Sequence, residues 1–164
     1  MTPKRGNTAF IDGANLHKGA ASLGLNLDYG RFRIWLKEKY GVDAALLFIG
    51  YVSSNKALYG RLRQAGYQPV FKETTRDGTG NIKGNCDADL VLWCVRGTYG
   101  SQYEKAVIVS GDGDYAGLVR FLRGRDALEC VVSPGARCSI LLMRTGAPIT
   151  YLRDIRVRVE SLPK

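Results

Sequence analysis

Two aspartates stand one residue apart, directly after an apolar segment in the second half of the chain. The stretch VIVSGDGDYAGLV, residues 107–119, places Asp112 and Asp114 in a glycine-rich turn that leads into a helical pattern. A tight turn needs at most one aspartate, whose side chain bonds to the backbone two residues further on. The second carboxylate therefore points to chemistry, because carboxylate oxygens are the ligands that hard divalent cations prefer.

Two further acids extend this pattern. Asp12 ends the apolar run TAFID, and Asp87 lies in the stretch KGNCDADLVLWC. On a helical wheel, Asp87 falls beside an apolar side that includes Val91 and Cys94, whereas Asp89 falls on the far side. The wheel predicts that Asp87 points toward a sheet and Asp89 toward solvent.

Each acid also has a structural explanation as a turn residue, a helix N-cap or a first-turn carboxylate. Several carboxylates crowded at one edge repel each other and raise each other's pKa, and a bound divalent cation removes that repulsion. Oxygen ligands without cysteine or histidine favour Mg²⁺ or Mn²⁺. Such ions neutralise phosphate charge and activate water for in-line attack.

The composition limits the partners and the compartment. Lysine and arginine number 24 against 15 acids, which gives a net charge of +9. Such an excess indicates a polyanionic partner, most often nucleic acid; a protein that is simply basic is the alternative.

The four cysteines form no CxxC motif, and one histidine is too few for a usual zinc site, so reduced thiols in a cytoplasmic protein are expected. No run is long enough to cross a bilayer and no secretory signal is present, so we expect no membrane association.

The elements that must position the acids follow from apolar runs. Five runs predict strands at residues 8–12, 44–52, 68–73, 105–110 and 128–132. Such near-continuous runs are typical of parallel strands covered on both faces. Helical patterns lie between them, which predicts an α/β fold with a mostly parallel central sheet and helices on both faces, in one domain spanning residues 1–164. Ligands of such sheets bind at the carboxyl ends of the strands, where the acids would meet if the first and fourth strands are neighbours.

Apolar stripes place the helices. They predict helices around residues 32–40, 58–65, 88–95 and 115–122, the second of them capped by Gly66. The stripe of the third helix consists of Ala88, Val91, Leu92 and Val95. A short helix is expected within residues 133–146 and a terminal helix within residues 151–162, with a strand as the alternative for the latter. Residues 75–84 are predicted to form an irregular loop.

Three blocks of the sequence resemble the NYN domain family, which comprises PIN-like, metal-dependent ribonucleases and includes the LabA-like proteins. The blocks are FIDGANL (residues 10–16), KGNCDADLVL (83–92) and VIVSGDGDYAGLVRFLRGRD (107–126). The resemblance implies a three-layer, Rossmann-like PIN fold with strand order 3-2-1-4-5. It also implies an acidic pocket that binds Mg²⁺ or Mn²⁺ and hydrolyses RNA phosphodiester bonds.

The resemblance also implies roles for individual residues. The catalytic and metal-binding acids would be Asp12, Asp87, Asp112 and Asp114. Substrate or ligand contacts would come from Asn15, Lys83 and Ser110, with Arg76 as a further basic residue beside the predicted loop. The chain departs from the family at Gly113, where serine is frequent, and at Trp93, where many members carry another acid.

The expected function is a metal-dependent endoribonuclease that acts on single-stranded RNA. Basic side chains would contact phosphates, and Tyr99, Tyr103 and Tyr115 are candidates for stacking on bases, although Tyr115 also fits a core stripe. A non-catalytic RNA-binding or adaptor module, a DNA nuclease and a phosphatase of small esters are the alternatives. A homodimer through apolar residues of the last segments is also open.

Overall fold

The computed structural model describes residues 5–72, 75–76, 78–79, 82–83 and 86–163. The strands are β1 (Asn7–Asp12), β2 (Val42–Gly50), β3 (Tyr67–Lys72), β4 (Thr75–Arg76), β5 (Ile82–Lys83), β6 (Ala106–Val109), β7 (Leu128–Ser133) and β8 (Ile149–Tyr151). The α-helices are α1 (Gly13–Ser22), α2 (Tyr29–Tyr40), α3 (Lys56–Gln64), α4 (Asp87–Tyr99), α5 (Ala116–Gly124), α6 (Ile140–Met143) and α7 (Arg156–Val159). Short 3-10 helices are η1 (Ser53–Asn55), η2 (Gly113–Tyr115) and η3 (Leu152–Ile155).

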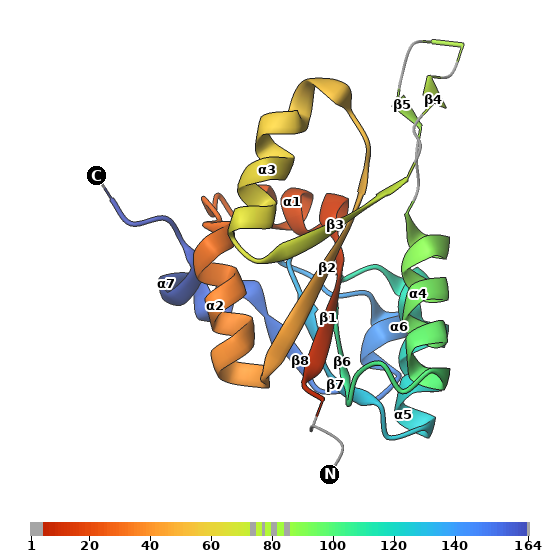
Figure 1. The fold of residues 1–164 in the computed structure, drawn as a ribbon. Coiled ribbons are helices and arrows are strands. Elements are labelled where there is room, and N and C mark those ends of the chain that lie inside the picture. The colour runs from red at the N-terminus through yellow and green to blue at the C-terminus, as the bar shows by residue number, and fades with distance from the viewer. Residues whose placement is uncertain (1–4, 73–74, 77, 80–81, 84–85, 164) are drawn as a thin grey trace.

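The central sheet has six parallel strands in the order β3-β2-β1-β6-β7-β8 (Figure 1). The first five strands have the predicted order 3-2-1-4-5, and the α/β, PIN-like architecture is confirmed. The chain adds β2 and β3 on one side of β1, then crosses to add β6, β7 and β8 on the other. The strand order therefore reverses between β1 and β6, and a crevice opens at the carboxyl ends of strands at such a point.

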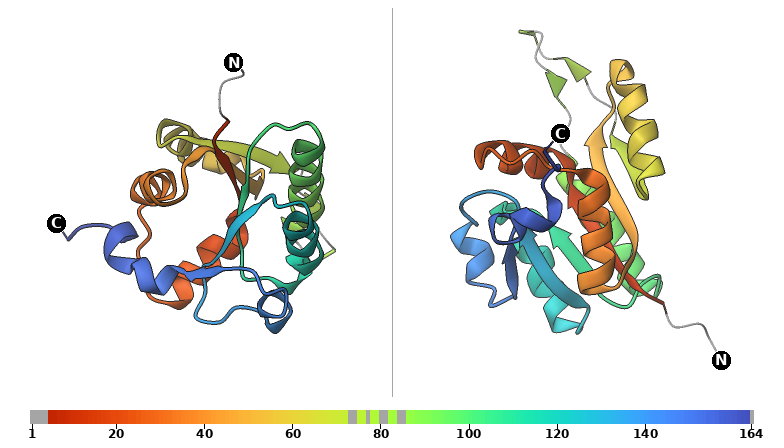
Figure 2. Two further views of the ribbon diagram at one scale, coloured as in Figure 1. Left: turned by 90° about the horizontal axis from the view of Figure 1, so that it is seen from below. Right: turned by 90° about the vertical axis from the view of Figure 1, so that its left-hand side faces the viewer.

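Helices cover both faces of the sheet, so the molecule has three layers (Figures 1 and 2). Strand residues alternate between the two cores: Ile11 packs with α1, α2, α3 and α7, whereas Phe10 packs with α4, α5 and α6. This alternation follows from the two-residue period of a strand. With apolar side chains on both faces, the central strands appear in the sequence as continuous apolar runs.

The ends of the helices follow local sequence rules. Asp28 caps α2 by accepting a bond from the backbone N–H of Arg31 at 3.0 Å, and Gly41 ends that helix with a φ of 64°. Gly13 begins α1 where a Cβ would lie 2.9 Å from the carbonyl oxygen of Phe48 and 2.2 Å from a methyl group of Ile49. A glycine at this position lets α1 start directly over the end of β2, which keeps Asp12 at the edge of the sheet.

The structure corrects three details of the sequence interpretation. A sixth strand, β8, precedes the terminal helical turns; three residues are too few to leave a periodic signal. The predicted stripe of α4 is wrong at Ala88 and Leu92, which are exposed, whereas Val91 and Val95 are half-buried and pack against the core. The helix instead buries Leu90, Cys94 and Gly97. Within the predicted irregular loop, β4 and β5 form an antiparallel pair, and the other described residues there, 78–79, form a turn.

Gly97 explains the choice of face on α4. A Cβ at this residue would lie 2.8 Å from the ring of Tyr103, so the glycine lets the helix pack closely on that buried tyrosine. The four cysteines are free thiols. Among the described helices, none has the length and apolar character needed to cross a membrane.

Candidate metal centre

Four aspartates converge at the carboxyl edge of the sheet, where the strand order reverses. Asp12 is the last residue of β1, and Asp87 is the first residue of α4. Asp112 and Asp114 lie between β6, the neighbour of β1, and α5. The acids thus come from three separate segments, and the parallel pairing of β1 with β6 is what brings them to one place.

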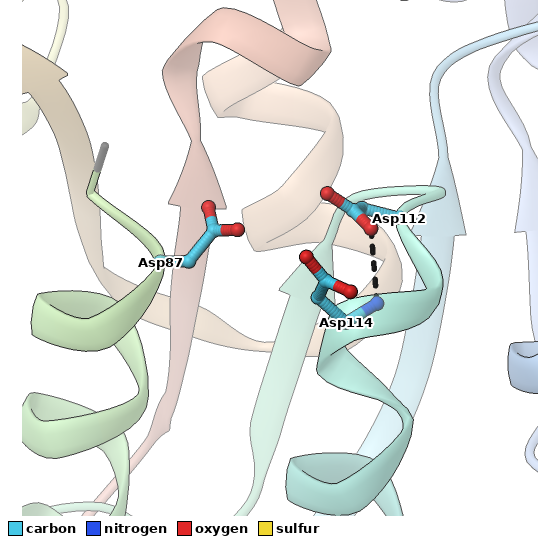
Figure 3. Close-up of side chains that lie close together, drawn as sticks. All are labelled: Asp87, Asp112 and Asp114. Carbon is cyan, nitrogen blue, oxygen red and sulfur yellow. Dashed lines mark hydrogen bonds between the residues drawn. The ribbon is translucent and has the colours of Figure 1, made fainter. Parts of the chain in front are cut away.

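Asp87, Asp112 and Asp114 form a triangle in which one carboxylate oxygen of each lies within 4.8 Å of the others. Figure 3 shows the three side chains pointing toward a common space between α4 and the turn after β6. Hard divalent cations bind oxygen at about 2.0–2.6 Å, so oxygens this far apart can share one ion. The donor set is carboxylate alone, which fits Mg²⁺ or Mn²⁺ better than zinc.

Asp12 lies behind this triangle and is 7% exposed. Its Oδ1 accepts a hydrogen bond from the backbone N–H of Asn15 at 3.1 Å, so it caps α1 as well. Burial raises the pKa of Asp12, and the charges of Asp87 and Asp112 raise it further. The hydrogen bonds from Asn15 and Tyr115 oppose that rise in pKa. A nearby cation would favour the charged form of this buried carboxyl in the same way.

Tyr115 connects Asp12 to the triangle, and sequence reasoning missed this role. Its hydroxyl lies 2.8 Å from Oδ1 of Asp87 and 3.1 Å from Oδ2 of Asp12, and it can donate to either. Burial and the two carboxylates raise the pKa of Tyr115 well above its ordinary value, so the hydroxyl keeps its proton. The available signal was a tyrosine in a core stripe, because a buried phenol needs a polar partner.

The turn that carries Asp112 and Asp114 is held by short-range bonds. The Oγ of Ser110 accepts from the backbone N–H of Asp112 at 3.1 Å, and Oδ1 of Asp112 accepts from that of Asp114 at 2.9 Å (Figure 3). Asn15 ties the turn to α1, because its Oδ1 accepts from the backbone N–H of Gly111 at 2.9 Å. Ser110 is fully buried and Asn15 is half-buried, and both position the turn through these bonds.

The glycines of the turn are required for close packing rather than for a left-handed backbone, since neither has a positive φ. A Cβ at Gly113 would lie 2.5 Å from Oγ of Ser139 and 3.1 Å from a methyl group of Leu141, beside α6. A Cβ at Gly111 would lie 2.9 Å from Oγ of Ser133. The turn therefore fits against the segment that leads into α6.

The outcome differs among the other residues that were singled out from the sequence. Asp89 pairs with Lys72 at 3.8 Å on the outer side of α4, away from the triangle. The backbones of Arg76 and Lys83 belong to the paired strands β4 and β5, but their side chains lie outside the described part of the chain. Tyr103 and Tyr115 are buried, so the prediction that they stack on bases is wrong. Tyr99 is exposed, with the guanidinium of Arg125 over its ring at 4.5 Å.

Two hollows adjoin the acids. The larger, about 950 Å³, has Asp12, Asp87 and Asp112 at one end and continues between α1 and α3. The smaller, about 520 Å³, lies between α4 and η2 and is lined by Asp87, Asp114 and Tyr115 together with apolar residues of α4. Asp87 therefore borders both hollows.

Comparisons with known proteins identify the family and the fold. The NYN domain matches residues 8–141, which is most of the chain. A crystal structure of a protein of unknown function from Vibrio parahaemolyticus is similar over 93% of this chain and 96% of that one, with a TM-score of 0.73 and 20% sequence identity. At that identity the likeness concerns the fold alone. No curated protein matches the sequence.

Proposed function

The chain belongs to the NYN domain family, a PIN-like nuclease family, and from this we propose that it is a metal-dependent endoribonuclease of single-stranded RNA. The observation that carries the proposal is the triangle of Asp87, Asp112 and Asp114, whose oxygens lie within 4.8 Å of one another. The net charge of +9 gives a second line of support, because a basic surface attracts a polyanion to an acidic centre.

The carboxylates would hold Mg²⁺ or Mn²⁺, which supplies charge neutralisation of the phosphate and activation of water when bound. Asp87, Asp112 and Asp114 would contact the ion, and Asp12 would complete its surroundings from the buried side. The hydroxyl of Tyr115 would orient the carboxylates of Asp12 and Asp87, in the manner of the outer-shell partners that fix metal ligands.

The remaining predicted residues would act on the turn or on the RNA. Asn15 and Ser110 would keep the turn in place through the backbone N–H groups that they accept from. Arg76 and Lys83, on β4 and β5, would contact phosphates; this pair of strands lies beyond the carboxyl end of β3, on the side of the N-terminus of α4 (Figure 1). Such contacts are insensitive to sequence and weaken as salt is added.

The test is cleavage of labelled single-stranded RNA, with DNA of the same sequence and a chromogenic phosphate ester as competing substrates. We expect cleavage of RNA with Mn²⁺ or Mg²⁺ and none with EDTA. Asp112→Asn should slow cleavage about a thousandfold, which corresponds to about 4 kcal/mol of lost transition-state stabilisation. Internal cut positions would identify an endonuclease.

Asp126→Asn is the matched control, because it removes the same charge from a side chain that is 93% exposed and pairs with Lys105 before β6. It should cleave like wild type. Salt-sensitive RNA binding without metal-dependent cleavage would identify a binding module instead, and preferential cleavage of DNA or of the ester would overturn the assignment of the substrate. Wild-type rates in Asp112→Asn would show that the triangle is not the active site.

A further inference from the structure

The larger hollow at the metal centre is a partly open site whose size and lining the carboxylates alone do not explain. It extends from Asp12, Asp87 and Asp112, at the edge of the sheet, to Tyr29 at the start of α2. One wall comes from α1 and the other from α3, while the carboxyl end of β2 forms the floor. Its volume, about 950 Å³, is at the upper end of the range of about 300–1,000 Å³ found for pockets that enclose small organic ligands.

The chemistry of the walls changes along the hollow. Next to the acids the surface is polar, whereas Ile49, Leu58 and Leu62 line the part between α1 and α3. Burial of a phosphate against these aliphatic side chains would cost desolvation of its charge. A flat ring with apolar faces and polar edges fits better, since Asn55 and the phenol of Tyr29 also border the same space.

Basic residues lie on both helices beside the hollow. Lys18 of α1 borders it together with His17, and α3, whose Leu58 and Leu62 form the opposite wall, also carries exposed Lys56 and Arg61. Basic side chains in these places would follow a sugar–phosphate backbone at the mouth while its base points inward, the usual division of contacts in single-strand recognition. A free apolar ligand would not be stabilised by these basic side chains.

We propose that the hollow between α1 and α3 is a nucleobase subsite, which encloses one base of the RNA next to the phosphate at the metal centre. The inference rests on the proposed function, since the acids mark the position of the phosphate. The smaller hollow, about 520 Å³, which Asp87 also borders, receives the neighbouring nucleotide against α4. The difference in size makes the enzyme sensitive to a missing base on one side of the cut and tolerant on the other.

The first experiment measures cleavage of an RNA in which single positions are replaced by an abasic ribose. One position beside the scissile phosphate should raise KM about tenfold in the wild type, in line with a stacking contribution of about 1–3 kcal/mol per enclosed base. Leu58→Trp, at a residue that is 38% exposed and lines the hollow, should raise KM for intact RNA by a similar factor and abolish the abasic effect. The kcat should stay within about threefold, because the carboxylates are untouched.

Ile34→Trp is the control, since Ile34 is 57% exposed on α2 and does not line the hollow. It should retain both the wild-type KM and the abasic effect. If Leu58→Trp does not fold, Ala14→Phe fills the hollow from α1 instead. Equal sensitivity to abasic sites at all positions, or a wild-type KM in a folded filled variant, overturns the subsite.

A binding measurement separates this inference from the proposed function. In EDTA, adenosine 5′-monophosphate should shift the NMR signals of the methyl groups of Ile49, Leu58 and Leu62, and ribose 5-phosphate should not. Shifts with the nucleotide alone support the subsite even if no RNA is cleaved. Equal shifts with both compounds, or shifts elsewhere only, overturn it even if cleavage is metal-dependent.

Discussion

The two halves of the carboxylate cluster are held in different ways. Asp12 and Asp87 come from β1 and α4, and the hydroxyl of Tyr115 lies between them. Asp112 and Asp114 lie on a turn whose short-range bonds run to Ser110 and within the pair itself, with Asn15 of α1 as a further anchor. The first half is therefore joined by a side chain from a distant segment, and the second is held mostly by short-range bonds.

The two halves also differ in exposure, which suggests a division of work. Asp12 is buried, and burial raises the pKa of its carboxyl, so its charge is costly when no cation is bound. Asp114 is exposed and open to an approaching phosphate. A centre made only of buried acids would exclude the substrate, whereas one made only of exposed acids would hold an ion loosely. The combination offers both fixed geometry and access.

Tyr115 follows Asp114 on η2 and its hydroxyl contacts Asp12 and Asp87, so Tyr115→Phe breaks the contact between the halves. Among the variants that keep all four acids, we expect the largest effect from this one. The ring keeps its packing, but Asp12 and Asp87 lose a shared donor. Loss of an outer-shell partner typically weakens metal affinity or activity about 10–100-fold. The Mn²⁺ concentration for half-maximal cleavage should rise by about that factor, with kcat at saturating Mn²⁺ changed much less; a titration of activity against Mn²⁺ measures both.

Tyr103→Phe controls for the loss of a buried hydroxyl. The hydroxyl of Tyr103 donates to the carbonyl of Cys94 at 2.8 Å, about two turns along α4 from Asp87. Its removal should lower stability by about 1 kcal/mol and leave the Mn²⁺ dependence unchanged. If the two variants behave alike in the Mn²⁺ titration, Tyr115 is a packing residue and not a link between the halves.

The local half can be displaced with Gly113→Ala, for which we expect a smaller loss. The new methyl group would press on Oγ of Ser139 and on Leu141, so the turn must shift by a few tenths of an ångström or more. Overpacking of this kind costs about 1–3 kcal/mol. We expect a decrease in cleavage of about tenfold and a lower melting temperature.

Gly117→Ala is the matched control, because a Cβ at that position of α5 meets nothing within 4 Å. Alanine should stabilise the helix slightly and leave cleavage unchanged. Replacing Ser139 by alanine beside Gly113→Ala should recover part of the activity by removing the nearer of the two contacts. Absence of any recovery would place the damage elsewhere than in the packing of the turn on α6.

The same distinction between local and tertiary contacts explains how much of the structure could be predicted from the sequence. The order of the first five strands, the convergence of the acids and the inward side of Asp87 followed from apolar runs, a helical wheel and the family resemblance. The apolar runs and the wheel are patterns that a single chain displays, whereas the strand order came from the resemblance alone. The sequence left open whether Asp112 caps a helix. The structure shows that Asp112 has both roles, because it caps η2 and its carboxylate is part of the triangle.

Features that depend on contacts between distant segments were not predictable. The hydroxyl of Tyr115 reaches Asp12 across 103 positions of sequence, and no periodicity reports such a contact. Part of the stripe of α4 was assigned wrongly because Leu92 is as apolar as the residues that pack, and the close approach of Tyr103 to Gly97 decides the face. The strand β8 is held by its register with β7 rather than by a sequence signal of its own.

The buried half of the cluster can also be tested by measuring stability. We expect the change in stability to be the smallest of the predicted effects. A carboxyl whose pKa is raised in the folded state stabilises the fold below its unfolded pKa and loses that contribution as pH rises through the folded value. For Asp12 the loss begins above the ordinary value of 3.8 and is complete once the buried carboxyl ionises. Asp12→Asn removes this penalty and keeps a good N-cap for α1.

We therefore expect Asp12→Asn, in EDTA at neutral pH, to melt at a higher temperature than wild type although it no longer cleaves RNA. Below pH 4 the difference should shrink, since the wild-type carboxyl is then protonated. Asp28→Asn, at the N-cap of α2, makes the same change away from the cluster and should alter the melting temperature little.

Added Mn²⁺ should raise the melting temperature of wild type more than that of Asp12→Asn, because a bound cation stabilises the charged carboxylate of Asp12. If Asp12→Asn melts below wild type in EDTA at neutral pH, the buried carboxylate stabilises the fold by itself, and the contrast between a costly buried half and an open half fails.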